Sequence, residues 1–240
     1  MYANYRDSHK RHDKGVSYDN EFQKNPHRSL VWELERKVLD DILRRFMVAR
    51  LFRHLDFACG TGRIIAYLED RMASSYGVDI SPSMLDVAKK KVKRATIIEA
   101  DLTRNDVLGD HQFDLITAFR FFPNAEYKLR FEVINVLMKH LTTDGYLVFN
   151  NHKNDGSLLN RIGRFFGRDG YNGMPNNEVD ELLKLAGLKV EKVYPIGFMP
   201  ATELRLILPQ SLLRPIENAA LELKIFPNLA QDLVFVCRRL

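Results

Sequence analysis

The sequence predicts an α/β fold, a doubly wound and mostly parallel sheet with helices on both faces. Short apolar runs alternate with helix-like segments between residues 51 and 150, an order typical of parallel strands joined by crossover helices. The first apolar run, residues 51–57, stops at a loop of small residues that holds two glycines, and an apolar helical pattern follows. A glycine loop between a first strand and its helix is typical of nucleotide-type ligand sites.

The central part of the chain is expected to contain five strands with helices between them. The strands are predicted at residues 51–57, 75–79, 95–99, 113–119 and 146–150. Helices are predicted at residues 63–71, from Pro82 onward with Ser81 as the N-cap, and at 125–141 with a turn at 143–145 after it.

The two ends of the chain are expected to surround this centre. Residues 1–27 are polar and weakly periodic, which favours a mobile arm or lid, and a helix with apolar residues at helical spacing begins at Ser29. We therefore divide the chain into an arm with a lid helix, residues 1–45, and a ligand-binding domain, residues 46–240. In the last third we expect helices at 155–167 and 176–186, strands at 188–194 and 231–237, and an apolar, proline-punctuated insertion at 196–228.

The composition, with 45% hydrophobic and 28% charged residues in a chain of 240, is that of an ordinary globular protein. No apolar run approaches the roughly 18 residues that span a membrane, and the first residues have no apolar core like that of a secretory signal. Cys59 and Cys237 give neither a disulfide framework nor metal-ligand spacing, so we expect a cytoplasmic protein without a metal. The positive residues behind the net charge of +5 are scattered, so we expect no nucleic-acid partner.

The glycine loop indicates the kind of ligand. It reads Leu55-Asp56-Phe57-Ala58-Cys59-Gly60-Thr61-Gly62-Arg63. Glycines there allow positive φ and let a ligand lie against the main chain, while the N–H groups at the start of the next helix face the same space. The fingerprint of NAD-binding loops has a third glycine for close packing of helix on strand, but Ile65 stands there.

With Asp56 at its start, the loop resembles the first motif of the class I S-adenosylmethionine (SAM) dependent methyltransferases, acidic-x-(Gly/Ala)-x-Gly-x-Gly. Ala58 stands where many members of that family have glycine. The resemblance covers residues 51–150 well and implies a seven-stranded sheet with an antiparallel last strand, SAM as cofactor and S-adenosylhomocysteine (SAH) as product. It implies a set of cofactor-binding residues: Asp56, Ala58, Cys59, Gly60, Thr61, Gly62, Asp79, Ile80, Asp101, Leu102 and Phe119.

Two acids in this set have specific roles. Asp79 ends a predicted strand, where a carboxylate can accept hydrogen bonds from both ribose hydroxyls, as in other nucleotide sites of this topology. By the resemblance, Asp101 accepts a hydrogen bond from the adenine amino group and Leu102 packs on the adenine face.

Residues 118–124 would line the methyl-donor cleft with aromatic rings. This stretch lacks the Asn/Asp-Pro-Pro-Tyr/Phe sequence of adenine- and amide-N methyltransferases, which argues against those acceptors.

His152, just after the strand at 146–150, is the best-placed candidate for a general base toward a hydroxyl acceptor. SAM is already an activated electrophile, so an enzyme mainly aligns the nucleophile and excludes water. Cys59 is expected to fill space in the loop rather than to act as a nucleophile. Four aromatic residues are candidates for a lid over the cofactor: Tyr5, Tyr18, Phe22 and Trp32.

The sequence thus predicts methyl transfer from SAM to an oxygen or nitrogen nucleophile of a small-molecule or sugar-like acceptor. Two alternatives stay open, an RNA methyltransferase that uses the basic surface and a non-catalytic SAM-binding protein. A NAD(P)-dependent oxidoreductase is disfavoured by the missing third glycine and by the absence of a Tyr-x-x-x-Lys pair. Residues 196–228 are expected either to cap the acceptor or to form a homodimer contact.

Overall fold

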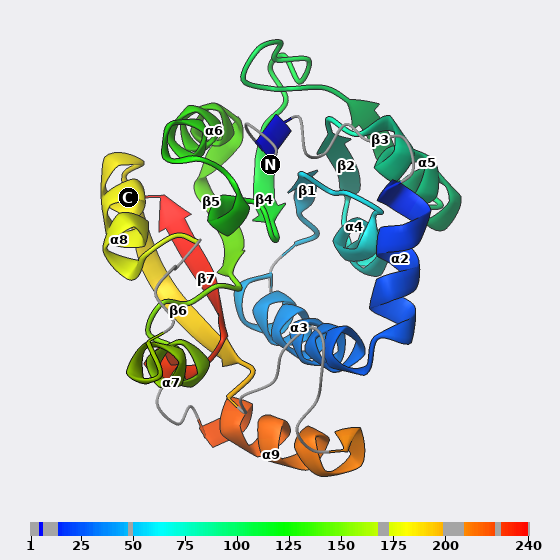
Figure 1. Cartoon of the computed structure of the whole chain (residues 1–240). Helices are drawn as coiled ribbons and strands as arrows, with labels where there is room; N and C mark the ends of the chain where they lie inside the picture. The colour runs from blue at the N-terminus through cyan, green and yellow to red at the C-terminus, as the bar shows by residue number, and fades with distance from the viewer. Residues whose placement is uncertain are drawn as a thin grey trace.

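A seven-stranded sheet forms the centre of the computed structural model (Figure 1). Its strands lie in the order β3-β2-β1-β4-β5-β7-β6; β1 to β5 pair in parallel, and β7 runs antiparallel to both β5 and β6. The strands are β1 (Arg53–Phe57), β2 (Ser74–Asp79), β3 (Thr96–Glu99), β4 (Phe113–Ala118), β5 (Leu141–Asn151), β6 (Leu188–Ile196) and β7 (Asp232–Arg239). The structure describes residues 5–6, 14–47, 50–167, 173–198, 209–223 and 227–239. The predicted fold class is confirmed.

Helices surround the sheet, with α6 and α8 on one side of it and α3 and α4 on the other (Figure 1). The helices are α2 (Lys14–Lys24), α3 (Pro26–Phe46), α4 (Arg63–Leu68), α5 (Pro82–Lys91), α6 (Tyr127–His140), α7 (Leu158–Phe165), α8 (Asn176–Leu185) and α9 (Gln210–Leu223), with short 3-10 helices η1 (Glu69–Arg71), η2 (Phe122–Asn124) and η3 (Pro227–Leu229). None of the helices in the described part of the chain is long and apolar enough to cross a membrane.

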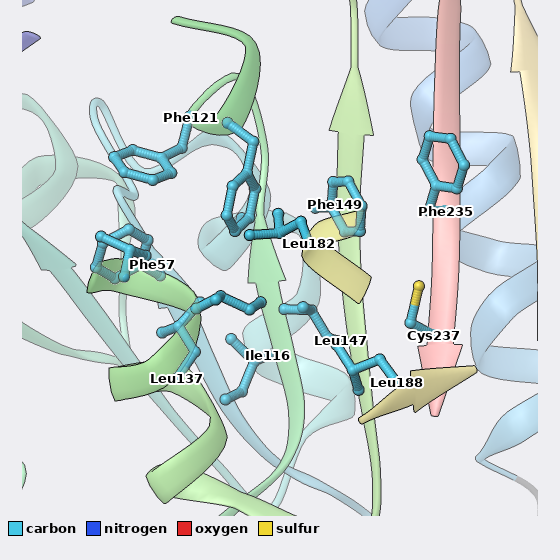
Figure 2. Close-up of a cluster of buried hydrophobic side chains, with 14 of the residues drawn as sticks. Phe57, Ile116, Phe121, Leu137, Leu147, Phe149, Leu182, Leu188, Phe235 and Cys237 are labelled. Carbon is cyan, nitrogen blue, oxygen red and sulfur yellow. The ribbon is translucent and has the colours of Figure 1, made fainter. Parts of the chain in front are cut away.

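The alternation of side chains along the strands builds one apolar core on each face of the sheet. On β4, Ile116 belongs to the core under α6 and α8, and its neighbour Leu115 belongs to the core under α3 and α4. On β5, Leu147 and Val148 divide in the same way. Figure 2 shows the first core, in which Leu182 of α8 lies against the strands. Both faces are covered, and the central strands are therefore apolar on both sides.

Most predicted elements lie within a few residues of the observed ones, and two segments differ. The turn predicted at 143–145 is wrong: these residues belong to β5, because Leu141 pairs with Phe113 and a register shift lets the strand begin there. The segment predicted as an arm contains α2, which packs on α3 and α5. Phe22 of α2 is buried, and the Arg28 guanidinium lies 5.2 Å from its ring centroid. Such tertiary contacts stabilise a helix that hydrophobic periodicity does not reveal.

The predicted insertion at 196–228 contains α9, which packs on α3. Leu213 is 2% exposed and belongs to the core under α3, and the Arg214 guanidinium pairs with Glu33 of α3 at 2.9 Å. Leu212 and Ile216, by contrast, are 55% and 43% exposed. Residues 199–208 and 224–226 lie outside the described residues, so a cap and a homodimer contact both stay predictions for this segment.

Glu69 anchors the chain at the entry to β3. Its carboxylate is 4% exposed and accepts hydrogen bonds from the backbone N–H groups of Lys93, Arg94 and Ala95 at 2.8–2.9 Å. Burial raises the pKa of Glu69, but these hydrogen bonds outweigh burial and hold the pKa below its usual range. The side chain thus fixes the loop from which β3 and Asp101 follow.

Replacing Glu69 by alanine removes the acceptor for three N–H groups, so we expect Glu69→Ala to lower the free energy of unfolding by about 1–3 kcal/mol. Urea unfolding at pH 7 measures this change. Asp70→Ala is the matched control, because Asp70 is exposed on the same short helix; its effect should stay within about 0.5 kcal/mol. Equal losses in the two variants would contradict the anchoring role of Glu69.

Candidate cofactor and acceptor site

Asp56 lies beneath the glycine loop and joins three elements of the fold. Its carboxyl group is 1% exposed; it accepts a hydrogen bond from the Ile65 N–H of α4 at 3.2 Å and one from Thr117 Oγ1 of β4 at 2.6 Å. Thr117 Oγ1 lies 2.9 Å from Nε2 of the buried His54. Burial raises the pKa of Asp56 to about 7 and lowers the pKa of His54 to about 3. Neutral His54 can therefore donate from Nε2 to Thr117 while the Thr117 hydroxyl donates to Asp56.

The glycine loop has the backbone geometry that the sequence predicts. Three of its residues have positive φ: Ala58 at 53°, Gly60 at 53° and Gly62 at 74°. Glycine is required at position 62 for two reasons. Its φ is positive, and a Cβ atom there would lie 2.9 Å from the Ala88 side chain of α5. Cys59 is buried, which raises the pKa of its thiol well above the usual range and keeps it protonated at neutral pH. The main chain of the loop is thus exposed to a ligand while its side chains pack inward.

Asp79, at the carboxyl end of β2, stands between the loop and α5. One carboxylate oxygen accepts a hydrogen bond from the Gly60 N–H at 2.8 Å, and the other accepts one from the Ser81 N–H at 2.9 Å. Two backbone groups therefore orient this side chain before any ligand binds. Asp79 lines both of the cavities described next.

The first cavity is narrow and lies at the ends of β2 and β3. Its volume is about 30 Å³, room for about two water molecules, and its lining includes Asp79, Asp101 and Leu102. Tyr5 and Arg6 also line it. The Arg6 guanidinium donates to Asp101 at 2.8 Å and to Thr103 Oγ1 at 2.6 Å. The Arg6 guanidinium thus occupies the Asp101 carboxylate, the group that the sequence analysis expects to bind adenine.

The candidate lid residues separate into two pairs. Tyr5 lines both cavities and lies edge-on to Phe121, with 5.1 Å between ring centroids, and Tyr18 lines the second cavity. Phe22 and Trp32 instead hold the Arg63 guanidinium, which lies 4.6 Å and 4.3 Å from their ring centroids. The first pair is therefore placed to cover a ligand, and the second pair packs α2 and α3 against α4.

The second cavity is larger, about 680 Å³, and shares Tyr5, Ala58 and Asp79 with the first. The carboxyl ends of β1, β4 and β5 and the first turn of α3 surround it, as expected for a ligand site in a doubly wound sheet. Its polar and charged lining includes His27, Arg28, Asp79, Arg120, Asn124, His152, Lys153, Gln231 and Asp232. Its apolar lining includes Val31, Met84, Phe119, Leu159 and Ile196.

Arg120 has a left-handed backbone, with φ at 60°, directly after β4. Its N–H donates to Asn150 Oδ1 at 2.6 Å, and Asn150 Nδ2 donates to Asp232 Oδ2 at 2.8 Å. Asp232 is 4% exposed, and its other oxygen has no hydrogen-bond partner among the described residues. Burial and the nearby charge of Glu35 raise the pKa of Asp232 to about 7. A non-glycine residue with positive φ and a buried acid with an unused oxygen both indicate a functional site.

His152 lines the same cavity, just after β5. Its Nδ1 atom is buried and finds no hydrogen-bond partner in the part of the chain that the structure describes. Burial lowers the pKa of His152 well below its usual value, and the positive charges of Arg120, Lys153 and Arg28 lower it further. The imidazole is thus uncharged at neutral pH and can accept a hydrogen bond from a ligand.

The comparisons with known proteins agree with this geometry. Residues 55–149 match the model of a family described as a methyltransferase domain. This segment holds the glycine loop, Asp79 and Asp101, and with the order of the strands it identifies a class I SAM-dependent methyltransferase domain within the chain. The predicted class and the predicted cofactor, SAM, are confirmed.

Similar proteins include enzymes with different acceptors. Malonyl-[acyl-carrier protein] O-methyltransferase of Enterobacter lignolyticus (strain SCF1) is 32% identical over 91 residues, which are 38% of this chain and 36% of that protein. Magnesium protoporphyrin IX methyltransferase of Synechocystis PCC 6803 with bound SAH is similar in fold, with a TM-score of 0.66 and 14% identity over 95% of this chain and 96% of that chain. A chain of the complex between the Haloferax volcanii Trm112 methyltransferase activator and a methyltransferase is also similar in fold. Its TM-score is 0.63, with 14% identity over 99% of both chains. The similarity to the solved structures concerns the fold.

The structure brings most of the predicted site residues together. Seven of them line one or both cavities: Ala58, Gly60, Asp79, Ile80, Asp101, Leu102 and Phe119. Asp56, Cys59, Thr61 and Gly62 lie in or under the loop and shape it. Sequence reasoning placed Arg120 in the stretch expected to line the cleft but gave its side chain no role, and it missed Lys153 and Asp232. For Arg120 and Lys153 the available signal was their position soon after strand ends, at the edge of the sheet where ligands bind.

The raised pKa of Asp56 predicts a pH dependence of stability. A carboxyl group with pKa 3.8 in the unfolded chain and about 7 in the folded one contributes stability below pH 4 that is lost progressively as the pH rises to 7. Asparagine at this position does not titrate. We expect Asp56→Asn to become more stable relative to wild type between pH 5 and pH 8, by on the order of 2–4 kcal/mol. Thermal unfolding across this range measures the difference; parallel curves for the two proteins would show that Asp56 does not titrate there.

Proposed function

We propose that this chain transfers the methyl group of SAM to an oxygen or nitrogen atom of a small-molecule acceptor, which binds in the larger cavity. The observation that carries this proposal is the position of Ala58 and Asp79, which line both cavities. A cofactor that extends from Asp101 past Asp79 presents its reactive end to the larger cavity. The volume of about 680 Å³ there leaves room for an acceptor beside it.

The cofactor residues have separate tasks in this proposal. Asp79 accepts hydrogen bonds from the ribose hydroxyls, a task for which the Gly60 and Ser81 N–H groups already orient it. A carboxylate has about four acceptor positions, so it can hold the loop and the ribose together. Asp101 and Leu102 take the adenine once Arg6 has moved aside.

When bound, SAM supplies a methyl group on a positively charged sulfonium that is already activated for displacement. The chain has to hold the acceptor in line with that methyl group and to keep water out. Phe119, 7% exposed, contributes an apolar wall beside the loop. His152, which lines the cavity and whose Nδ1 has no hydrogen-bond partner among the described residues, accepts the proton of a hydroxyl acceptor.

The cavity also favours this proposal over the two alternatives. Room for an acceptor next to the cofactor residues supports an enzyme over a non-catalytic SAM-binding protein. The cations Arg28, Arg120 and Lys153 line a cavity together rather than an open surface, which supports a small acceptor over RNA. RNA binding with a steep salt dependence would favour the RNA methyltransferase instead.

The first test is cofactor binding by calorimetry. Wild type should bind SAM and SAH but not NADH, and Asp79→Ala should weaken SAH binding about 100-fold, since hydrogen bonds to a charged group contribute about 1.5–3 kcal/mol each. Asp86→Ala is the control, because Asp86 is an exposed acid on the neighbouring helix α5. Binding of NADH without binding of SAM would overturn the proposed function.

The second test concerns His152. Acceptors are first found by measuring SAH release from wild type in the presence of alcohols, amines and carboxylic acids. For a hydroxyl acceptor, His152→Gln should lower kcat at least about 100-fold, the low end of what a general base contributes. The Kd for SAH should stay within about twofold. Full activity of His152→Gln on such an acceptor would remove His152 from the mechanism.

A further inference from the structure

We propose that helix α7 docks this protein on an anionic lipid surface, with Phe165 and Phe166 inserted among the lipids and Arg161 and Arg164 against the phosphate headgroups. The contact is with the surface of a membrane, since none of the described helices is long and apolar enough to cross one. Docking of this kind goes beyond the proposed function and does not depend on it.

Helix α7 is amphipathic, but its apolar side does not pack into the protein. Leu158, Ile162 and Phe165 follow one another at spacings of four and three residues, which places them on one face of the helix. Phe166, four residues after Ile162, continues this face. No residue of α7 is buried, and none belongs to either core of the sheet. Figure 1 shows α7 at the margin of the molecule.

Three exposed side chains, Ile162, Phe165 and Phe166, form what we call the α7 surface. Phe165 and Phe166 are 85% and 74% exposed, and in the described part of the chain no other large apolar side chain is as exposed. Their rings lie edge-on to each other, with 5.4 Å between the centroids. Single apolar residues on a surface are common, but adjacent exposed rings beside an exposed isoleucine indicate a contact surface.

Polar side chains hold α7 to the rest of the protein. Asn160, Arg161 and Arg164 each donate a hydrogen bond to a backbone carbonyl oxygen of residues 154–156, at 2.7–3.0 Å. Asn154 in that turn is fully buried, so the turn itself is fixed. The polar side of the helix is therefore attached to the protein, and the apolar side remains exposed.

The charge around the α7 surface favours an anionic partner. Arg161 and Arg164 are both exposed, and between Ser157 and Gly167 the chain holds these two arginines and no acid. A helix with phenylalanine on one face and arginine on the other is typical of segments that lie in the headgroup region of a membrane. Apolar insertion and attraction of cations to anionic lipids then act together.

The size of the α7 surface argues against a second copy of the chain as the partner. Its three side chains expose roughly 400 Å² together, since an aromatic side chain has about 150–250 Å² of surface. A stable protein interface needs about 800 Å² from each partner. A second copy would also bring the arginines of both copies close together, and they would repel. Lipid chains need no matching surface, because they adapt to the shape of an inserted ring.

The same helix reaches the larger cavity. Leu159 lines that cavity, and it lies six residues before Phe165, about 9 Å along the helix axis. A membrane in contact with Phe165 and Phe166 is therefore close to the acceptor site. Docking through α7 would hold this site at the membrane, where amphipathic molecules are concentrated.

The test is co-sedimentation of the full chain with vesicles, either of phosphatidylcholine alone or of equimolar phosphatidylcholine and phosphatidylglycerol. Wild type should bind the anionic vesicles at least about tenfold more tightly than the neutral ones at low salt, and added salt should weaken binding. The double variant Phe165→Ser with Phe166→Ser should weaken binding to anionic vesicles at least about tenfold. Because both rings are exposed, the double variant should keep the circular dichroism spectrum and thermal stability of wild type.

Leu185→Ser is the matched control for the apolar change, because Leu185 is 66% exposed at the end of α8. Its binding should stay within about twofold of wild type. Arg161→Gln with Arg164→Gln should weaken binding to anionic vesicles at least about fivefold. Lys128→Gln with Lys189→Gln removes the same charge from side chains that are 89% and 63% exposed elsewhere, and its effect should stay within about twofold.

Several results would overturn the inference. Absence of binding to both kinds of vesicle is one, and equal weakening by Leu185→Ser and by the phenylalanine variant is another. Binding of soluble polyglutamate or polyuridylate without binding of vesicles would assign the arginines to an acidic protein or to RNA. A dimer that the phenylalanine variant dissociates, seen by gel filtration without vesicle binding, would assign the α7 surface to a second copy. None of these results bears on SAM binding, so the proposed function is tested separately.

Discussion

The site depends on one buried carboxyl group, that of Asp56. Its hydrogen bonds to Ile65 and Thr117 tie the end of β1 to the first turn of α4 and to the neighbouring strand β4. The glycine loop runs between the points that these bonds fix, so its positive φ angles are held in place from below. Because the Asp56 carboxyl group is buried, its protonated form is stabilised. It therefore adds no full negative charge next to Asp79.

Charged residues line both cavities of the site. The cofactor end presents Asp79 and Asp101, carboxylates suited to hydroxyl and amino groups and to a ligand with a positive sulfonium. The larger cavity is lined by Arg120 and Lys153 together with a neutral His152.

Much of this arrangement could be predicted from the sequence, for a reason that lies in the topology. The carboxyl ends of parallel strands gather at one edge of a sheet, so Asp79 and Asp101 could be placed together from chain order alone. Asp232 could not, because it begins a strand rather than ending one. It reaches the same edge since β7 is antiparallel and its first residues pair with the last residues of β5. The helix α2 was not predicted either, because a contact between Phe22 and Arg28 of the next helix stabilises it and its own sequence has little hydrophobic periodicity.

The sequence by itself determined the fold class, the glycine loop and the acids that follow it, because each depends on residues close together in the chain. Only the tertiary structure decided the charge states of Asp56 and His152 and the meeting of Arg28, Arg120 and Lys153 around one cavity. Burial and electrostatic potential are sums over neighbours in space, and most of those neighbours are distant in sequence. A sequence pattern therefore cannot predict burial or electrostatic potential at a residue before the pairing of the strands is known.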